Sequence, residues 1–216
     1  MFFLVKLSST RVYHQLAEVF CFDFVNLGVV SHFIRTLLKL KTINSEENSF
    51  KIREATAADV KALAALHVTT FNETHEGVNA PTYETREWQW QKAFQDKDDS
   101  WFCLVIEKKD EGLIGFAKGQ PYNHADHAEF LGELNKIYLL RKYHKLGLGR
   151  QLVCKVANEF IKRGINSMLL FGDANNPSNK FYEQMSAEKL FAKNGAFHGG
   201  YGWTDLKKLA ANCKNV

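Results

Sequence analysis

The chain has 216 residues, of which 45% are hydrophobic and 13% aromatic, and its formal net charge is +4. That length suits one domain with a substantial core and is too short for two large ones. The composition excludes a disordered or fibrous protein, and so mild a charge gives no reason to expect nucleic acid as a partner. The four cysteines are far apart and include no Cys-x-x-Cys pair, so they are interpreted as reduced thiols of a cytoplasmic protein: Cys21, Cys103, Cys154 and Cys213.

The first 49 residues differ in composition from the rest of the chain. They are rich in Phe, Val and Leu between Val12 and Leu40, but Glu18 and Asp23 interrupt the apolar stretch. The longest uncharged run there, Phe24–Ile34, would span about 16 Å as a helix, roughly half of a bilayer core. We therefore expect a peripheral amphipathic helix or docking segment. A membrane span and a disordered or wrongly translated extension are less favoured alternatives.

A polar linker, Thr42–Ser49, leads to the predicted domain, residues 50–210, and a short tail covers 211–216. Hydrophobic periodicity and turn residues predict its elements. In chain order they are a strand opening at Phe50, a helix from about Val60 capped by Thr56 or Asp59, a helix over Tyr83–Phe94, strands over Trp101–Glu107, Leu113–Gly119 and Ala128–Leu139, a helix over Gly147–Arg163, a strand over Ser167–Phe171, a short helix over Pro177–Met185, and two strands within Lys189–Leu206. This mixed order indicates an α/β fold, a twisted sheet covered by helices.

The segment between Arg141 and Arg150 joins an expected strand to an amphipathic helix. Gly147 and Gly149 let the backbone approach a ligand closely. The unpaired N–H groups of the first helical turn and the helix dipole make an anion site. Four basic side chains add positive charge with no acid among them: Arg141, Lys142, Lys145 and Arg150. We expect a pyrophosphate here, with an ordinary strand–helix turn as the alternative, since neither the Walker nor the Rossmann pattern is present.

Two motifs point to one family. Glu133-Leu-Asn-Lys-Ile-Tyr-Leu-Leu, followed by His144-Lys-Leu-Gly-Leu-Gly149, resembles the acetyl-CoA-binding signature of GNAT N-acetyltransferases, Gln/Arg-x-x-Gly-x-Gly/Ala after a strand. About 25 residues further on, Asn175–Glu183 resembles the family's Asn-x-x-Ala-x-x-Phe-Tyr segment. The resemblance covers about Phe50–Leu209. The sequence departs from it at His144, where the family has Gln or Arg, and at Ser186-Ala187, where many members have Gly-Phe.

The resemblance implies a GNAT-like mixed, strongly twisted sheet of about six to seven strands flanked by about four helices. It also implies direct attack of a primary amine on acetyl-CoA, a cosubstrate, in a ternary complex. In the family, a tyrosine at the position of Tyr182 is the acid that protonates the leaving thiolate. A glutamate at the position of Glu133 is the base, acting through water, because an alkylammonium with a pKa near 10.4 is rarely deprotonated at neutral pH. Glu129 is the second candidate for the base.

The cosubstrate contacts are also implied by the resemblance. Backbone groups of Ile137–Leu139 are expected to pair with the pantetheine arm, and the Leu139 N–H to face the thioester oxygen. Asn175 is expected to orient the pantetheine or a water. The full expected set is Ile137, Tyr138, Leu139, Lys142, His144, Lys145, Leu146, Gly147, Leu148, Gly149, Arg150, Asn175 and Ser178. No metal is expected, because His124 and His127 stand in a polar stretch without a third ligand.

The expected acceptor pocket comes from Asn72–Trp90 and Gly195–Trp203. Four acidic residues in the first stretch face a single Arg86: Glu73, Glu76, Glu84 and Glu87. Our hypothesis is therefore a small cationic amine such as a polyamine; a protein N-terminus, a lysine side chain and an amino sugar are alternatives. At least one of Trp88 and Trp90 is expected in the core.

Two other classes of function fit the same sequence. One is a non-catalytic CoA-binding sensor, and the other is a membrane-associated adaptor that works through residues 1–49. A homodimer is compatible with either the enzyme or the sensor.

Overall fold

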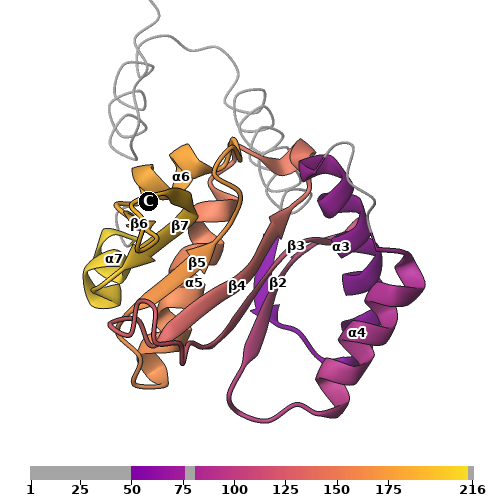
Figure 1. Cartoon of the computed structure of the whole chain (residues 1–216). Coiled ribbons are helices and arrows are strands. Elements are labelled where there is room, and N and C mark those ends of the chain that lie inside the picture. The colour runs from indigo at the N-terminus through magenta and orange to yellow at the C-terminus, as the bar shows by residue number, and fades with distance from the viewer. Residues whose placement is uncertain (1–49, 76–80, 214–216) are drawn as a thin grey trace, which may run out of the picture. The chain divides into compact units, whose positions relative to one another are not determined.

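This computed structural model describes residues 50–75 and 81–213, which form one compact unit. The predictions for residues 1–49 and for the last three residues of the 211–216 tail lie outside the described residues. Seven strands form one mixed sheet in the order β1-β2-β3-β4-β5-β7-β6 (Figure 1). The elements are β1 (Phe50–Glu54), α3 (Val60–Thr74), α4 (Tyr83–Gln95), β2 (Phe102–Lys108), β3 (Gly112–Pro121), β4 (Gly132–Leu139), α5 (Leu148–Lys162), β5 (Met168–Phe171), α6 (Asn179–Gln184), β6 (Glu188–Phe191), β7 (Phe197–Trp203) and α7 (Leu206–Asn212). Within these residues no helix is long and apolar enough to span a bilayer.

Helices α3 and α4 cover one face of the antiparallel half of the sheet, β1 to β4 (Figure 1). Of the two predicted capping residues, Thr56 forms a capping box with Asp59 around a 3-10 turn, Ala57–Asp59, that leads into α3. Asp59 is the N-cap residue of α3 itself but forms no side-chain cap to it. The Arg53 guanidinium donates to both carboxylate oxygens of Asp59, each over 2.8 Å, and lowers the pKa of that carboxyl to about 2. This pair ties the start of the helical layer to β1.

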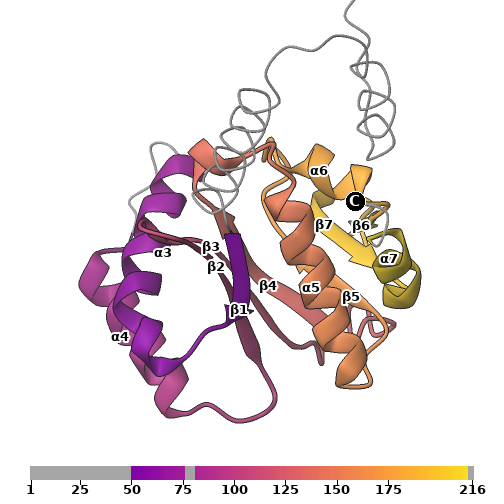
Figure 2. The same ribbon diagram turned by 180° about the vertical axis from the view of Figure 1, so that it is seen from behind.

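Helix α5 covers the opposite face, which Figure 2 shows from behind. Its predicted apolar side chains are all buried: Leu148, Leu152, Val153, Val156 and Phe160. Gly164 follows the helix with φ +79°, the left-handed conformation that commonly ends a helix. The amphipathic prediction for this segment is therefore confirmed.

The sheet opens beside β4. This strand pairs with β3 along its whole length, with a bulge that leaves Asn135 between the paired residues Leu134 and Lys136. It pairs with the parallel strand β5 only at Gly132 and Glu133. A bulge bends its strand and breaks the regular ladder. Beyond Glu133, the second edge of β4 has no strand beside it in the described part of the chain, so its peptide groups are available to a ligand.

The structure differs from the predicted elements in three places. The strand predicted from Ala128 begins only at Gly132, because His127 adopts φ +63° and its carbonyl accepts the Phe130 N–H in a turn. The helix predicted from Pro177 begins at Asn179. Helix α7 was not predicted at all. It continues past residue 210, although the predicted domain boundaries themselves stay predictions.

The prediction that all four cysteines are reduced thiols is wrong for one pair. Cys154 on α5 and Cys213 after α7 form a disulfide, with their Cα atoms 6.1 Å apart. Their separation of 59 residues concealed this pairing, because only the folded position of α7 brings the two together. Cys103 is free and buried, and burial raises the pKa of its thiol to about 12.

The departure at Ser186 leaves the end of α6 in the shape that a glycine normally gives it. Ser186 adopts φ +61°, and the Ala187 N–H donates to the Tyr182 carbonyl over 3.0 Å. These are the left-handed residue and the long hydrogen bond of a Schellman ending. A left-handed non-glycine residue costs roughly 1–2 kcal/mol, so serine reproduces this ending at a loss of stability.

Candidate active site

The segment before α5 has the backbone geometry of a candidate anion site. Lys145 and Gly147 adopt φ +63° and +79°, so left-handed residues alternate along the segment. The first helical hydrogen bond joins the Gln151 N–H to the Gly147 carbonyl over 3.0 Å, leaving the N–H groups of Leu148 and Gly149 without a backbone partner. Successive N–H groups in such a conformation, at the positive end of a helix dipole, surround an anion. The geometry fits the predicted pyrophosphate.

The basic side chains of this segment are less available than the sequence indicated. Lys142 forms an ion pair with Glu111 at 2.6 Å, so an acid distant in sequence does neutralise one of the four charges. The Arg141 guanidinium donates to the Glu73 carbonyl, and the Arg141 N–H donates to the Glu73 carboxylate over 2.8 Å. Lys145 forms no ion pair within the described ranges. The main-chain N–H groups at the start of α5 are therefore better placed to receive an anion than most of these side chains.

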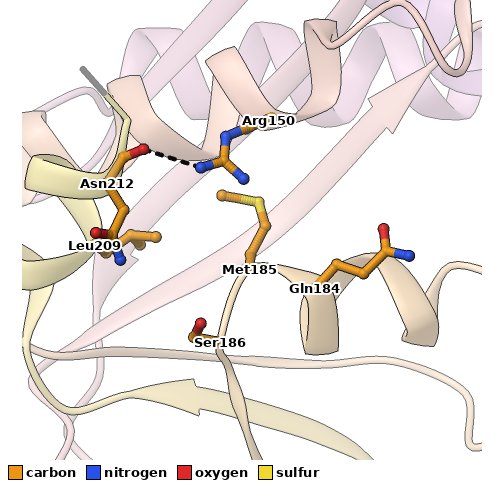
Figure 3. A pocket seen from close by; sticks show the side chains of 6 residues that line it. All are labelled: Arg150, Gln184, Met185, Ser186, Leu209 and Asn212. Carbon is orange, nitrogen blue, oxygen red and sulfur yellow. Dashed lines mark hydrogen bonds between the residues drawn. The ribbon is translucent and has the colours of Figure 1, made fainter. Parts of the chain in front are cut away.

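Two further residues of the predicted loop are engaged with other parts of the chain. The His144 imidazole Nε2 lies 2.9 Å from the Leu139 carbonyl oxygen, so this ring closes the turn between β4 and α5. Arg150 donates to the Asn212 carbonyl over 3.0 Å (Figure 3). It lies beside a pocket of about 260 Å³ between α5, α6 and α7, which contains neither predicted catalytic residue and is lined by Arg150, Gln184, Met185, Ser186, Leu209 and Asn212.

Glu133 occupies the place where β4 separates from β5. Its carboxylate accepts the Gln120 amide over 2.8 Å and the Asn135 amide over 3.2 Å. Because side chains alternate along a strand, apart from the bulge, Glu133 shares the α3/α4 face with Lys136 and Tyr138. The carboxylate is thus held on the opposite face of the sheet from α5. Glu129, the second candidate for the base, lies in the loop before β4. Its carboxylate Oε1 is 3.7 Å from the His127 Nδ1.

Tyr182 is half-buried in the middle of the short helix α6. Its ring lies 5.5 Å from that of Tyr201 and 6.4 Å from that of Trp203. Burial, with Tyr138 and Tyr201 nearby, raises the pKa of the Tyr182 hydroxyl above its usual value. The effect of Tyr138 on this pKa shows that α6 lies on the side of β4.

The remaining predicted residues are at the ends of elements. The Asn175 N–H donates to the Asp173 carboxylate over 2.7 Å, and its side chain is exposed. The Ser178 N–H donates to the Asn176 side chain over 2.8 Å at the start of α6. Trp90 is buried and Trp88 is 62% exposed, which confirms the prediction that one of them lies in the core. No group of three His, Cys, Asp or Glu in the described segments could hold a metal.

Sequence reasoning missed a cationic cluster beside Glu133. Lys118 on β3 and Lys136 on β4 are paired across the two strands, and both are half-buried. His67 on α3 is buried among aromatic rings above them. Lys118 is two residues from Phe116, and this spacing could have placed it on the face under α3 and α4. The bulge in β4 shifts the alternation, so the face that Lys136 occupies could not be predicted.

The comparisons with known proteins agree with this geometry. The model of the acetyltransferase (GNAT) family matches residues 61–186. The uncharacterized N-acetyltransferase YuaI of Bacillus subtilis is 30% identical over 171 residues, which cover 73% of this chain and 95% of that protein. Among solved structures, the PaiA N-acetyltransferase of Thermoplasma acidophilum in complex with coenzyme A has a TM-score of 0.55 at 18% identity, covering 71% of this chain and 98% of that one.

A third similar protein is the spermidine/spermine N-acetyltransferase SpeG of Vibrio cholerae. Its TM-score is 0.52 at 15% identity, and the match covers 76% of this chain and 97% of that one. The seven-stranded sheet and its helices confirm the predicted fold class. The chain therefore belongs to the acetyltransferase (GNAT) family and is an acyltransferase, an N-acetyltransferase that depends on acetyl-CoA.

Proposed function

We propose that this enzyme transfers the acetyl group of acetyl-CoA to a primary amine of a small molecule by direct attack within a ternary complex. The observation that carries the proposal is the free edge of β4, which starts at Glu133 and leads into the backbone anion site at the start of α5. Peptide groups along such an edge suit an extended amide-containing chain, and the N–H groups beyond it suit a pyrophosphate. When bound, acetyl-CoA supplies the activated thioester.

In this proposal Glu133 is the base. Two amide donors, Gln120 and Asn135, keep its carboxylate in one orientation on the face opposite α5. A carboxylate held there can take a proton from the attacking ammonium group, directly or through one water. The base is useful because the free amine is a small fraction of an alkylammonium at neutral pH.

Tyr182 takes the role of the acid by donating a hydrogen bond to the departing thiolate, whose proton finally comes from solvent. Its raised pKa keeps the hydroxyl protonated throughout the physiological range. Among the described residues no group forms a hydrogen bond with this hydroxyl, whereas the neighbouring Tyr201 hydroxyl is bound to Glu183 at 3.0 Å. A protonated, uncommitted hydroxyl stabilises a thiolate by donating a hydrogen bond to it.

The acceptor is the least constrained part of the proposal. A small cationic amine stays our hypothesis from the sequence, and the similar fold of a spermidine/spermine acetyltransferase is compatible with it. Among its supposed acidic ligands, however, Glu73 is engaged with Arg141, Glu84 is exposed, and Glu76 lies outside the described residues. Protein acceptors, a cytoplasmic location, a homodimer and membrane contact through residues 1–49 also stay predictions.

The test is acetyl-CoA-dependent thiol release by the full chain over a panel of small amines. We expect amine-dependent release that falls at least about tenfold in Tyr182→Phe and about a hundredfold in Glu133→Gln, since general acids and bases contribute on this scale. Tyr201→Phe and Glu129→Gln are matched controls, because each removes the same group from a neighbouring position. They should keep turnover within about threefold of wild type.

Saturable binding of CoA without release for any amine would favour the sensor instead. Controls that lose as much activity as the Tyr182 and Glu133 variants would show that the assigned roles are wrong.

A further inference from the structure

Three cations gather on the acceptor side of the sheet. Lys118 and Lys136 lie side by side on β3 and β4, and two residues along the same strands Phe116 and Tyr138 pack under α3 and α4. Both lysines therefore face the helices. Arg86 approaches from α4, and burial followed by the charges of Lys118 and Arg86 lowers the pKa of Lys136. Like charges are thus concentrated in a partly buried place.

No carboxylate forms an ion pair with any of the three among the described residues. Their hydrogen bonds go to neutral amide oxygens: Lys118 to Gln120 at 3.1 Å, Lys136 to Asn135 at 2.8 Å and Arg86 to Gln89 at 2.9 Å. The carboxylate of Glu133 is reached only through two of these amides. Burial lowers the pKa of Lys118 and of Lys136, and the charge of the nearby Glu133 carboxylate opposes this shift, but Glu133 contacts neither lysine and has no such effect on Arg86. One carboxylate held at a distance leaves three half-buried cations only partly neutralised, which is unfavourable unless something else neutralises them.

Buried polar atoms without partners surround the same place. They are His67 Nδ1, Arg86 Nε and Trp90 Nε1. The His67 ring is 2% exposed and lies 5.1 Å from the Tyr138 ring and 6.1 Å from the Trp90 ring. The arginine and tryptophan nitrogens can only donate hydrogen bonds. Orphan buried donors are rare in folded proteins and call for an acceptor that the chain itself does not supply.

We propose that Arg86, Lys118 and Lys136 bind a carboxylate carried by the acceptor, so that the substrate is an amine that also bears an acid, of the amino-acid class. The inference rests on the proposed function and names its substrate class. The amino group would lie by Glu133. The carboxylate would neutralise the three cations and accept hydrogen bonds from the unpaired nitrogens of Arg86 and Trp90. A polyamine would instead place more positive charge beside them, so this inference and the cationic-amine hypothesis make opposite predictions.

The first test compares matched acceptors with the full-length enzyme. Each free amino acid in the panel is assayed beside its amide and its decarboxylated amine, for example phenylalanine, phenylalaninamide and phenethylamine, with spermidine alongside. We expect at least one acid with kcat/KM about tenfold or more above its two analogues, because hydrogen bonds to charged groups are worth this much. Amides or spermidine that match or exceed every acid would overturn the inference and leave the acetyltransferase function standing.

The second test asks whether Arg86, Lys118 and Lys136, the three cations of the proposed site, cause the preference for the acid over its amide. Lys136→Gln and Arg86→Gln should reduce the ratio of kcat/KM between acid and amide to within about threefold of unity, mainly by raising the KM for the acid. Lys61→Gln, an exposed lysine on α3, is the control and should keep the wild-type ratio. A ratio unchanged in both cluster variants would contradict the assignment.

A binding measurement separates the two proposals. Trp90 and Trp101 lie in the core that faces the cluster, and Lys118 lies 4.9 Å from the Trp101 ring, so tryptophan fluorescence should change saturably with the preferred acid. Such binding with no thiol release would refute the proposed function and keep the carboxylate site. Neither binding nor release for any acid would refute the site.

Discussion

The two faces of the sheet use positive charge differently. On the α5 side, basic side chains are bound by the chain itself: Lys142 by Glu111, and Arg150 by the Asn212 carbonyl. The N–H groups at the start of α5 remain open. On the α3/α4 side, the backbone is covered and the charges of Arg86, Lys118 and Lys136 have no carboxylate paired to them among the described residues.

The difference corresponds to what each side is proposed to recognise. Main-chain donors held by left-handed residues have a fixed geometry that depends little on side chains, which suits a cosubstrate group that never varies. Side-chain charges can be changed one residue at a time. Charged groups at a site discriminate between ligands because they attract the opposite charge and repel the like charge. The covered face is therefore where acceptor choice is expected to reside.

The largest expected effect concerns the disulfide that holds α7 against the α5 side. Closing a loop of 59 residues restricts the unfolded chain, and its loss is expected to cost about 2–4 kcal/mol. Urea unfolding of the wild type, with and without reductant, should show this loss. Cys213→Ser should resemble the reduced wild type and lose most of its sensitivity to reductant, because it removes the partner of Cys154. Equal stability of the wild type in both conditions would contradict the pairing.

The next effect tests whether the face of the sheet under α3 and α4 excludes water and carries positive charge. Burial, and then the charges of Arg86 and Lys136, lowers the pKa of His67 from 6.5 to about 3. Below pH 6.5 His67 binds a proton in the unfolded chain but stays neutral in the folded one. The free energy of unfolding therefore falls as the pH decreases toward 3. Between pH 7.5 and pH 5.0 the loss from this group should be about 2 kcal/mol.

Unfolding of His67→Phe at the two pH values provides the check. The variant should lose most of that pH dependence, since phenylalanine fits among the same rings and does not titrate. His198→Gln, an exposed histidine on β7, should retain the wild-type dependence. Asp59 does not interfere, because its ordinary pKa of 3.8 lies below this window. A wild type equally stable at both pH values would mean that water reaches His67.

A third effect separates backbone strain from anion binding. Gly147 and Gly164 lie at the two ends of α5, both with φ +79° and with no other atom within 4 Å of the place where a Cβ would lie. Alanine at either should destabilise the fold by about 1 kcal/mol, the usual cost of a left-handed residue. Only Gly147→Ala should also raise the KM for acetyl-CoA, about threefold to tenfold, since it displaces the N–H groups that we propose bind the pyrophosphate. Equal KM values in the two variants would argue against the backbone site.

The sequence could predict those features that depend on residues close together along the chain. The face of α5, the cap at Thr56 and the anion-binding loop depend on neighbours within a few residues, and periodicity and glycine spacing record these. The partners of the loop cations do not: Glu111 reaches Lys142 from the β2–β3 turn, 31 residues earlier. The pairing of Cys154 with Cys213 was concealed for the same reason.

The acceptor side was missed for a further reason. The acidic residues between Glu73 and Glu87 suggested a cationic ligand because they are close together in sequence. The lysines that matter are 18 positions apart and meet only through the pairing of β3 with β4. A one-residue bulge at Asn135 also decides which face Lys136 occupies. Sequence proximity thus misjudged the local charge, and pairing register determined it.

The smallest expected effect distinguishes paired from unpaired cations on the α5 side itself. Lys142 is already neutralised by Glu111 at 2.6 Å, whereas Lys145 has no such partner in the described part of the chain. Lys145→Gln should raise the KM for acetyl-CoA about threefold, the range of an exposed charge contact, and the effect should shrink at high salt. Lys142→Gln should change KM by less than about twofold. If Lys142→Gln had the larger effect, its ion pair would have to open when the cosubstrate binds, and side-chain charge would matter on this face as it does on the other.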